Sequence, residues 1–285
     1  MLVHERLDPN VDADSAIYKA MGLLSYPDQL EPENQDVETW RFMKFDRFKD
    51  LITSGELYFC RSDLFENDKR EGLPPEELLA MLGLHPLDVN DRRTLAHTMG
   101  TLAQNRESFY VSCWHLFREE TLRMWQEFGK KGVAICSRYS LLKSALSKFS
   151  DQAYIGLVRY GAQHLVRRQL EGHGWNLFRL ITTKRVEFAQ EREVRAFLWL
   201  PQYLGDDRHI DDQNRVYPYP LTPPPPHVPN GLRRKVDLQA LLTKIVISPW
   251  ASPTTINEIT RLVTDNAVDI AIEQSELTQH LQLLP

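Results

Sequence analysis

The sequence predicts an α+β fold in which mixed, mainly antiparallel sheets are flanked by helices. Segments with strand and helix patterns follow one another without the strict alternation of a doubly wound α/β protein. A chain of 285 residues that is 42% hydrophobic is large enough to bury a substantial core. The stretch VYPYPLTPPPPHVPN interrupts the regular segments, because consecutive prolines lack amide donors and fix φ.

Each regular segment can be assigned from its local pattern. ETWRFMKF is typical of a strand, and the next helix carries Phe48, Leu51 and Ile52 at helical spacing before Gly55 ends it. Further strands are predicted in ELYFC, SFYVSCW, KGVAICSRY, YIGLVRY, EREVRAFLW, LLTKIVISP and VDIAIEQSEL. Further helices are predicted in EETLRMWQEFG, in SLLKSALSKF, from AQHLVRRQL through ITTK, and in SPTTINEITRLVTDN. In the last helix, Ser252 is the expected N-cap and Pro253 the first helical residue.

The chain divides into an arm and one domain. Residues 1–36 are acidic and contain the stretch SYPDQLEPENQD, which indicates a loosely ordered N-terminal arm. Residues 37–285 form the predicted α+β domain. Within this domain we expect a helical insert at 75–105 and a proline-rich loop at 216–230.

Composition and the common motifs exclude several classes of function. A net charge of −5 gives no overall basic footprint for nucleic acid. No apolar run approaches the ~18 residues that span a bilayer, and the N-terminus lacks a signal-peptide core, so we expect a cytoplasmic protein without a membrane partner. Three cysteines without C-x-x-C spacing fit reduced thiols and no metal site. Phosphate-loop, dinucleotide-fingerprint, zincin and hydrolase-elbow motifs are all lacking.

An acidic pair stands where the strand in EFAQEREVRAFLWLP begins. If Glu191 and Glu193 both lie in the strand, their carboxylates project from the same face about 6–7 Å apart and repel each other. The pair then requires compensation by Arg192, by Arg195 or by a ligand's positive charge. The opposite face of the strand is expected to carry Val194, Ala196 and Leu198. A solvated strand end with interspersed charges is the alternative interpretation.

Several blocks in order resemble a bacterial family, the domain of unknown function 2971 family. The blocks are LYFCRSDLFENDKREG, YVSCW, RMWQEFGKKGVAI, TTKRVEFAQEREVRAFLW and LTKIVISP, and they cover the chain from about Trp40 onward. The sequence departs from the family pattern at Glu66 and Lys69, which flank Asn67-Asp68, and at Phe128, where the family has tyrosine. This resemblance implies no activity.

A second, looser resemblance implies one. Arg41 on an early strand, Ser112 on a middle strand and Glu191-x-Glu193 on a late strand follow the Arg, Ser-x-Ser, Glu-x-Glu order of ADP-ribosyltransferases. The resemblance implies that an ADP-ribosyltransferase-like core cleaves NAD, that Arg41 holds its phosphates and that Ser112 orients catalytic Glu193. Glu191 would then activate a protein or nucleic-acid acceptor. The residues expected to contact NAD are Arg41, Tyr58, Tyr110 and Trp125.

Such an enzyme would act as a toxin or phage-defence effector, with an antitoxin or partner effector protein as a possible regulator. Two other functions stay open. A metal-dependent nuclease-like effector would use a set of acidic ligands with Lys184 near phosphate; the candidate ligands are Asp63, Asp68, Glu71, Glu191 and Glu193. A non-catalytic sensor would bind partners through the proline-rich segment and the acidic arm.

Overall fold

A computed structural model describes most of the domain predicted from residue 37 onward. The described residues are 31–65, 68, 70–73, 105–117, 120–161, 165, 177–200, 209–210, 216–217 and 228–278. Residues 1–30 of the arm, nearly all of the expected helical insert and residues 218–227 of the proline-rich loop lie outside this part of the chain.

The described strands and helices have the following bounds. The strands are β1 Glu38–Met43, β2 Glu56–Arg61, β3 Phe109–Leu116, β4 Val133–Arg138, β5 Ala153–Leu157, β6 Arg159–Tyr160, β7 Thr183–Lys184, β8 Glu193–Trp199, β9 His209–Ile210, β10 Val216–Tyr217, β11 Gly231–Lys235, β12 Lys244–Ile247 and β13 Ala271–Gln274. The helices are α2 Phe45–Ser54, α5 Leu122–Met124, α6 Tyr139–Leu146, α8 Leu177–Ile181, α9 Leu238–Leu241 and α10 Pro253–Asp265. Short 3₁₀ helices are η1 Ser62–Leu64, η2 Arg106–Ser108 and η4 Val186–Glu191, and η3 Trp125–Gly129 is a π-helix.

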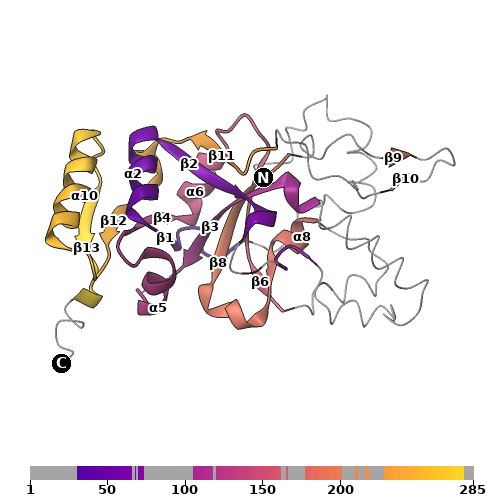
Figure 1. Cartoon of the computed structure of the whole chain (residues 1–285), viewed down its shortest axis with the longest axis horizontal. Coiled ribbons are helices and arrows are strands. Elements are labelled where there is room, and N and C mark those ends of the chain that lie inside the picture. Colours follow the sequence, from indigo (N-terminus) through magenta and orange to yellow (C-terminus); the bar gives the residue numbers. More distant parts are fainter. Residues whose placement is uncertain are drawn as a thin grey trace.

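Nine of the strands form one sheet with helices packed around it (Figure 1). The order along the main path is β11-β2-β3-β1-β4-β12-β13, and β8 joins β3 to β5. All of these pairs are antiparallel except β12 with β13. The predicted combination of a mainly antiparallel sheet and flanking helices is therefore confirmed.

Strand β3 is the centre of the sheet and has a gap on one edge. Strand β8 pairs along one edge of β3, from Phe109 to His115. The other edge is shared, because β2 pairs with β3 at residues 110–111 and β1 pairs with it at residues 115–116. Residues 112–114 of β3 therefore face a break between the ends of β1 and β2.

The two faces of the sheet are covered differently. Helices α2, α6, α9 and α10 bury one face, together with Trp114 from β3 and Ile135 from β4. The other face carries two smaller apolar clusters. One packs α8 against Phe109 and Phe197, and the other packs Trp125 against Phe42. The apolar face of β8, predicted to carry Val194, Ala196 and Leu198, indeed lies in the larger core.

Local sequence signals account for the end of α2 and the start of α10. Gly55 ends α2 in the left-handed region at φ 63°, which a glycine adopts without a steric clash because it has no Cβ atom. Ser252 caps α10 by accepting a hydrogen bond from the Thr255 amide, and Pro253 is the first helical residue, as predicted.

Three predicted segments were wrong in detail. Of the helix expected from AQHLVRRQL through ITTK, residues 162–164 and 166–176 lie outside the described part of the chain; α8 ends at Ile181, and Thr183–Lys184 forms strand β7, which pairs with β6. In the segment EETLRMWQEFG, only Leu122–Met124 is α-helical, and Trp125–Gly129 is a π-helix. The strand that was expected to include Glu191 begins only at Glu193.

The last described residues of the arm lie against helix α6. The Ser140 hydroxyl donates to Asp36 at 2.9 Å, and the Lys143 ammonium pairs with Glu31 at 2.6 Å. This end of the arm is thus bonded to the domain. Among the described residues, no helix has both the length and the apolar character needed to cross a membrane.

We expect Gly132→Ala to destabilise the protein. A Cβ atom at this position would collide with the backbone carbonyl oxygen of Met43, and neither backbone segment can yield without disturbing the β1–β4 pairing. Urea unfolding should show a loss of about 1–3 kcal/mol. Lys131→Ala, at the exposed neighbouring position, should change stability by no more than ~0.5 kcal/mol. Equal stabilities for the two variants would contradict this packing.

Candidate functional site

Five ionisable side chains meet on one face of the sheet, the face that also carries the two smaller apolar clusters. We call them the charge cluster: Glu71, Lys184, Glu191, Glu193 and Arg195. Their residues are between 0% and 8% exposed, although charged groups are rarely buried unless they are paired. They come from the loop after η1, from β7, from the end of η4 and from β8, so several separate chain segments build the site.

The Lys184 ammonium group is the centre of the charge cluster. Its Nζ lies 2.5 Å from Glu193 Oε1, 2.8 Å from Glu191 Oε2 and 3.9 Å from Glu71 Oε2. It also lies 4.7 Å from the centre of the Phe188 ring. Burial opposes the charged form, but the neighbouring carboxylates outweigh burial and raise the pKa of Lys184 above its ordinary value. The ammonium is therefore charged at neutral pH.

Arg195 holds the other side of Glu193. Its Nε donates to Glu193 Oε2 at 2.7 Å, and its remaining nitrogens bond Glu71 and the Ile181 carbonyl oxygen. Complete burial lowers the pKa of Arg195 to about 9, which leaves it charged at neutral pH. Both oxygens of Glu193 are thus fixed by cations on two different strands.

The two carboxylates of the acidic pair converge by a route that differs from the predicted one. Glu191 is the last residue of η4, and Arg192 turns the chain in the left-handed region at φ 44° before β8 begins. This conformation is uncommon for a residue with a side chain and is often found where a site imposes it. The turn, rather than a shared strand face, brings Glu191 and Glu193 to the same ammonium group.

The charge cluster becomes electrically neutral when one of its carboxylates binds a proton. Three carboxylates face two cations, which leaves one buried negative charge without a partner in the charge cluster. Burial, with the hydrogen bond and charge of Glu191, raises the pKa of Glu193 to about 7. Burial also disfavours ionised Glu191, but its hydrogen bond with Glu193 and the Lys184 charge prevail and lower its pKa. Near neutral pH the pair therefore combines an ionised carboxylate with one that gains and loses a proton.

His115 supports the pair from β3 and was not among the predicted site residues. Its Nδ1 lies 2.9 Å from the Glu191 carbonyl oxygen, and because a carbonyl can only accept, Nδ1 is the donor. Burial lowers the pKa of His115 to about 4, so the ring is neutral. The ring stacks on Phe117 at 5.8 Å and pairs across the strands with Glu193. His115 thus anchors the end of η4 beside β8.

The loop that supplies Glu71 is held by its own side chains. Asp68 accepts a hydrogen bond from the Arg70 amide at 3.0 Å, as aspartate side chains often do in turns. Asp68 also pairs with Arg185 at 3.1 Å, and Gly72 takes φ 78°. These contacts fix Glu71 against Arg195.

The strands that carry the predicted Arg41, Ser112 and Glu193 are neighbours in the sheet, in the order β1–β3–β8. Their side chains do not all meet. Alternation along β3 turns Ser112 away from Glu193, and its hydroxyl accepts a hydrogen bond from Trp114 Nε1 at 3.2 Å. Arg41 and Tyr58 line a common pocket.

Two further residues expected to contact NAD make contacts within the protein. The Tyr110 hydroxyl donates to the Pro229 carbonyl oxygen at 3.1 Å. Trp125 donates to Glu120 at 2.8 Å and packs edge-on against Phe42, with ring centres 4.9 Å apart. These contacts fit structural roles for both side chains.

The acids proposed as metal ligands do not all lie in one place. Asp63 pairs with Arg61 at 2.6 Å, whereas Glu71, Glu191 and Glu193 lie in the charge cluster, where Lys184 and Arg195 occupy the space between them. In the described part of the chain, no group of three or more histidine, cysteine or acidic side chains is arranged to hold a metal ion.

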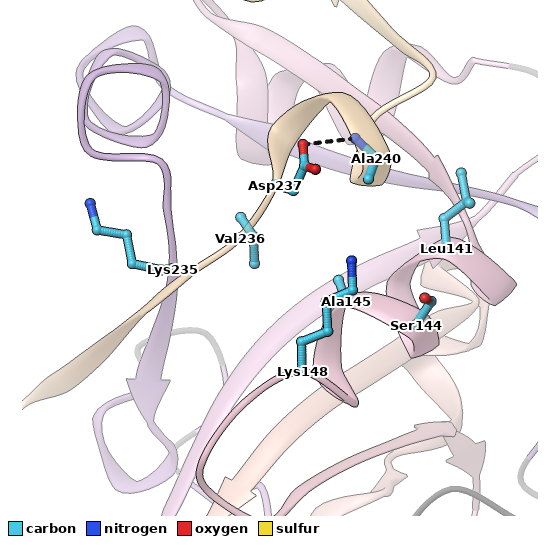
Figure 2. Close-up of a pocket in the computed structure, with 8 residues that line it drawn as sticks. All are labelled: Leu141, Ser144, Ala145, Lys148, Lys235, Val236, Asp237 and Ala240. Carbon is cyan, nitrogen blue, oxygen red and sulfur yellow. Dashed lines mark hydrogen bonds between the residues drawn. The ribbon is translucent and has the colours of Figure 1, made fainter.

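A second pocket, of about 200 Å³, lies between α6 and the β11–α9 segment (Figure 2). Apolar side chains such as Leu141, Ala145 and Val236 line much of it. Its carboxylate, Asp237, is already used as the cap of α9, where it accepts a hydrogen bond from the Ala240 amide at 3.1 Å. This pocket presents no acid–base pair, so the charge cluster is the better candidate for chemistry.

The raised pKa of Glu193 predicts how stability depends on pH. The folded state keeps the Glu193 proton up to about pH 7, whereas an unperturbed glutamate loses it near 4.5. The free energy of unfolding therefore includes a contribution that falls as pH rises between these values, by at most about 3 kcal/mol. Glu193→Gln removes this contribution.

Urea unfolding between pH 5 and pH 8 checks this expectation. The wild type should lose stability relative to Glu193→Gln as pH rises, and taking this difference cancels the titration of other groups. Glu187→Gln, at an exposed position in η4, should follow the wild-type curve. A difference between wild type and Glu193→Gln that stays constant across this range would refute the assigned proton.

Comparisons of the chain with protein-family models, with curated proteins and with solved structures each found no match.

Proposed function

We propose that the chain is an ADP-ribosyltransferase-like enzyme that cleaves NAD and modifies a protein or nucleic-acid acceptor. The observation that carries the proposal is the convergence of Glu191 and Glu193 on one buried ammonium group, with a single proton shared near neutral pH. The adjacency of the strands that bear Arg41, Ser112 and Glu193 supports it.

The charge cluster suits cleavage of a glycosidic bond. As the bond between ribose and nicotinamide breaks, nicotinamide leaves with the electron pair and the ribose develops oxocarbenium character. Ionised Glu193, accepting a hydrogen bond from a ribose hydroxyl, would stabilise this positive charge in a buried setting. The acceptor then bonds to the ribose carbon, and its proton passes to Glu191, which is ionised at neutral pH.

Lys184 and Arg195 take over the orienting role that the resemblance gave to Ser112. Each bonds one oxygen of Glu193, so the carboxylate cannot rotate freely. A group held in this way loses little freedom when substrate binds, which lowers the barrier for a reaction that needs one geometry.

A metal-dependent nuclease-like effector is the second candidate. The observation in its favour is that three of the acids named for it, Glu71, Glu191 and Glu193, do converge beside Lys184. A divalent cation would have to displace the ammonium or the guanidinium group from their carboxylates. Metal-dependent cutting of nucleic acid by the purified protein would identify this function.

Nicotinamide release tests the first proposal. We expect purified protein, supplied with NAD and cell lysate as a source of acceptors, to release nicotinamide without added divalent metal. Glu193→Gln should reduce the rate about 100-fold or more, which is the usual contribution of a positioned acid–base group. The wild-type rate should rise as pH increases through about 7, because the reaction requires ionised Glu193.

Glu187→Gln is the matched control, since this neighbouring acid is exposed and lies outside the charge cluster. Its rate should equal that of the wild type. If the wild type releases no nicotinamide under these conditions, or if Glu193→Gln releases it at the wild-type rate, the proposal fails.

A further inference from the structure

The pocket between α6 and the β11–α9 segment, which we call the α6–α9 pocket, has a mainly apolar surface (Figure 2). Leu141 and Ala145 line it from α6, and Val236 lines it from the residue after β11. All three are only partly buried, so some of their apolar surface is in contact with water. The volume of about 200 Å³ lies below the ~300–1,000 Å³ that is usual for small-molecule sites. The pocket is therefore sized for a side chain of a peptide rather than for a metabolite.

One lysine of the α6–α9 pocket has no counter-charge. The Lys148 side chain extends towards α9 (Figure 2), and no carboxylate in the described part of the chain pairs with its ammonium group. The other lysine, Lys235, donates to the Ser54 carbonyl oxygen at 2.6 Å and lies 3.7 Å from Glu56. A peptide that enters the pocket would therefore be favoured by an acidic residue beside Lys148.

The described end of the N-terminal arm runs along α6. The Val37 carbonyl oxygen accepts a hydrogen bond at 3.0 Å from the amide of Tyr139, the first residue of α6. Glu31 pairs with Lys143, one turn further along the helix. Burial alone would raise the pKa of Glu31, but hydrogen bonds from Lys143 and Gln35 prevail and lower it. Traced towards the N-terminus, the arm thus advances along α6 in the direction of its last turn.

The last turn of α6 borders the α6–α9 pocket. Ser144, the exposed residue next to Lys143, lines the pocket, and so do Ala145 and Lys148. A helix with its side chains is ~10–12 Å wide, and an extended chain covers ~3.3–3.6 Å per residue. About four residues ahead of Glu31 are therefore enough to carry the arm across α6 to the pocket.

The residues ahead of Glu31 include the side chains that this pocket favours. Residues 23–30 read LLSYPDQL, in which an aromatic residue, Tyr26, stands two positions before an acid, Asp28. Pro27 favours an extended conformation at the residue before it. Side chains two apart in an extended chain project to the same side, so Tyr26 and Asp28 can face the pocket together.

We propose that residues 24–30 of the arm bind in the α6–α9 pocket of the same chain, with the Tyr26 ring inside the pocket and the Asp28 carboxylate paired with Lys148. Burial of the ring against Leu141 and Val236 removes apolar surface from water, and the ion pair fixes the register. Because the arm is tethered at Glu31, its local concentration is high and a small interface is sufficient.

This inference goes beyond the proposed function and does not depend on it. An arm held in this way joins α6 to the β11–α9 segment. A partner protein that binds the acidic arm would have to displace it from the pocket, so the pocket would compete with such a partner.

Fluorine NMR of the full chain labelled with fluorotyrosine tests this docking. The Tyr26 signal is the one that Tyr26→Phe removes. In the wild type, this signal should differ in chemical shift from free fluorotyrosine and should be shielded from a soluble gadolinium chelate. Leu141→Asp should abolish both effects, because a charge in the pocket opposes burial of the ring. Leu122→Asp, at a leucine that is 38% exposed and lies outside the pocket, should leave the signal unchanged.

A second pair of variants tests the ion pair without altering the apolar lining. Lys148 is exposed, so Lys148→Gln should fold. Lys148→Gln and Asp28→Asn should each increase the relaxation of the Tyr26 signal by gadolinium, and the double variant should show no further increase because both remove the same interaction. Lys49→Gln, at an exposed position on α2, should behave as the wild type does.

The proposal would be overturned by a wild-type Tyr26 signal at the position of free fluorotyrosine. A shielded signal that neither Leu141→Asp nor Lys148→Gln changes would also overturn it, because the ring would then lie elsewhere. Shielding that is lost when the protein is diluted would reject docking within one chain, since the pocket would then hold the arm of a second copy.

Discussion

The candidate site depends on the ion pairs that the buried Lys184 ammonium makes with Glu191 and Glu193. These pairs join β7, the end of η4 and the start of β8, and Arg195 extends them to Glu71 in the loop after η1. Removing one partner of a buried pair leaves an uncompensated charge, which typically costs about 3–5 kcal/mol. The network holds the carboxylates of Glu191 and Glu193 in fixed positions, as the proposed chemistry requires.

The charge cluster and the pocket lined by Arg41 and Tyr58 are two consequences of how the sheet is built. Strand β3 pairs with β8 along one edge and with β1 and β2 end to end along the other. The first pairing places Glu193 beside His115, and the break in the second leaves room for the Arg41 side chain. Alternation along β1 places Arg41 on the face of the sheet that carries Trp114, opposite Glu193.

Short-range patterns predicted the fold class and most elements, because helix caps and the alternation of apolar residues depend on neighbours in the sequence. Ser252 and Gly55 are examples. The site was predicted only in part. The sequence identified Glu191 and Glu193, but the left-handed turn at Arg192 that joins them has no local signal, since arginine seldom adopts it. The roles of His115 and Lys184 follow from strand pairing and chain reversal, which link residues distant in sequence. For Ser112, the strand register decides which face it occupies.

The central claim is that Glu193 gains and loses a proton near neutral pH beside an ionised Glu191. Carbon-13 NMR of the glutamate side-chain carboxyls measures this most directly, because their chemical shifts change on protonation. The account predicts one signal that titrates at about pH 7 and that is absent from Glu193→Gln. It would be contradicted if every glutamate of the wild type titrated near the ordinary value of about 4.3.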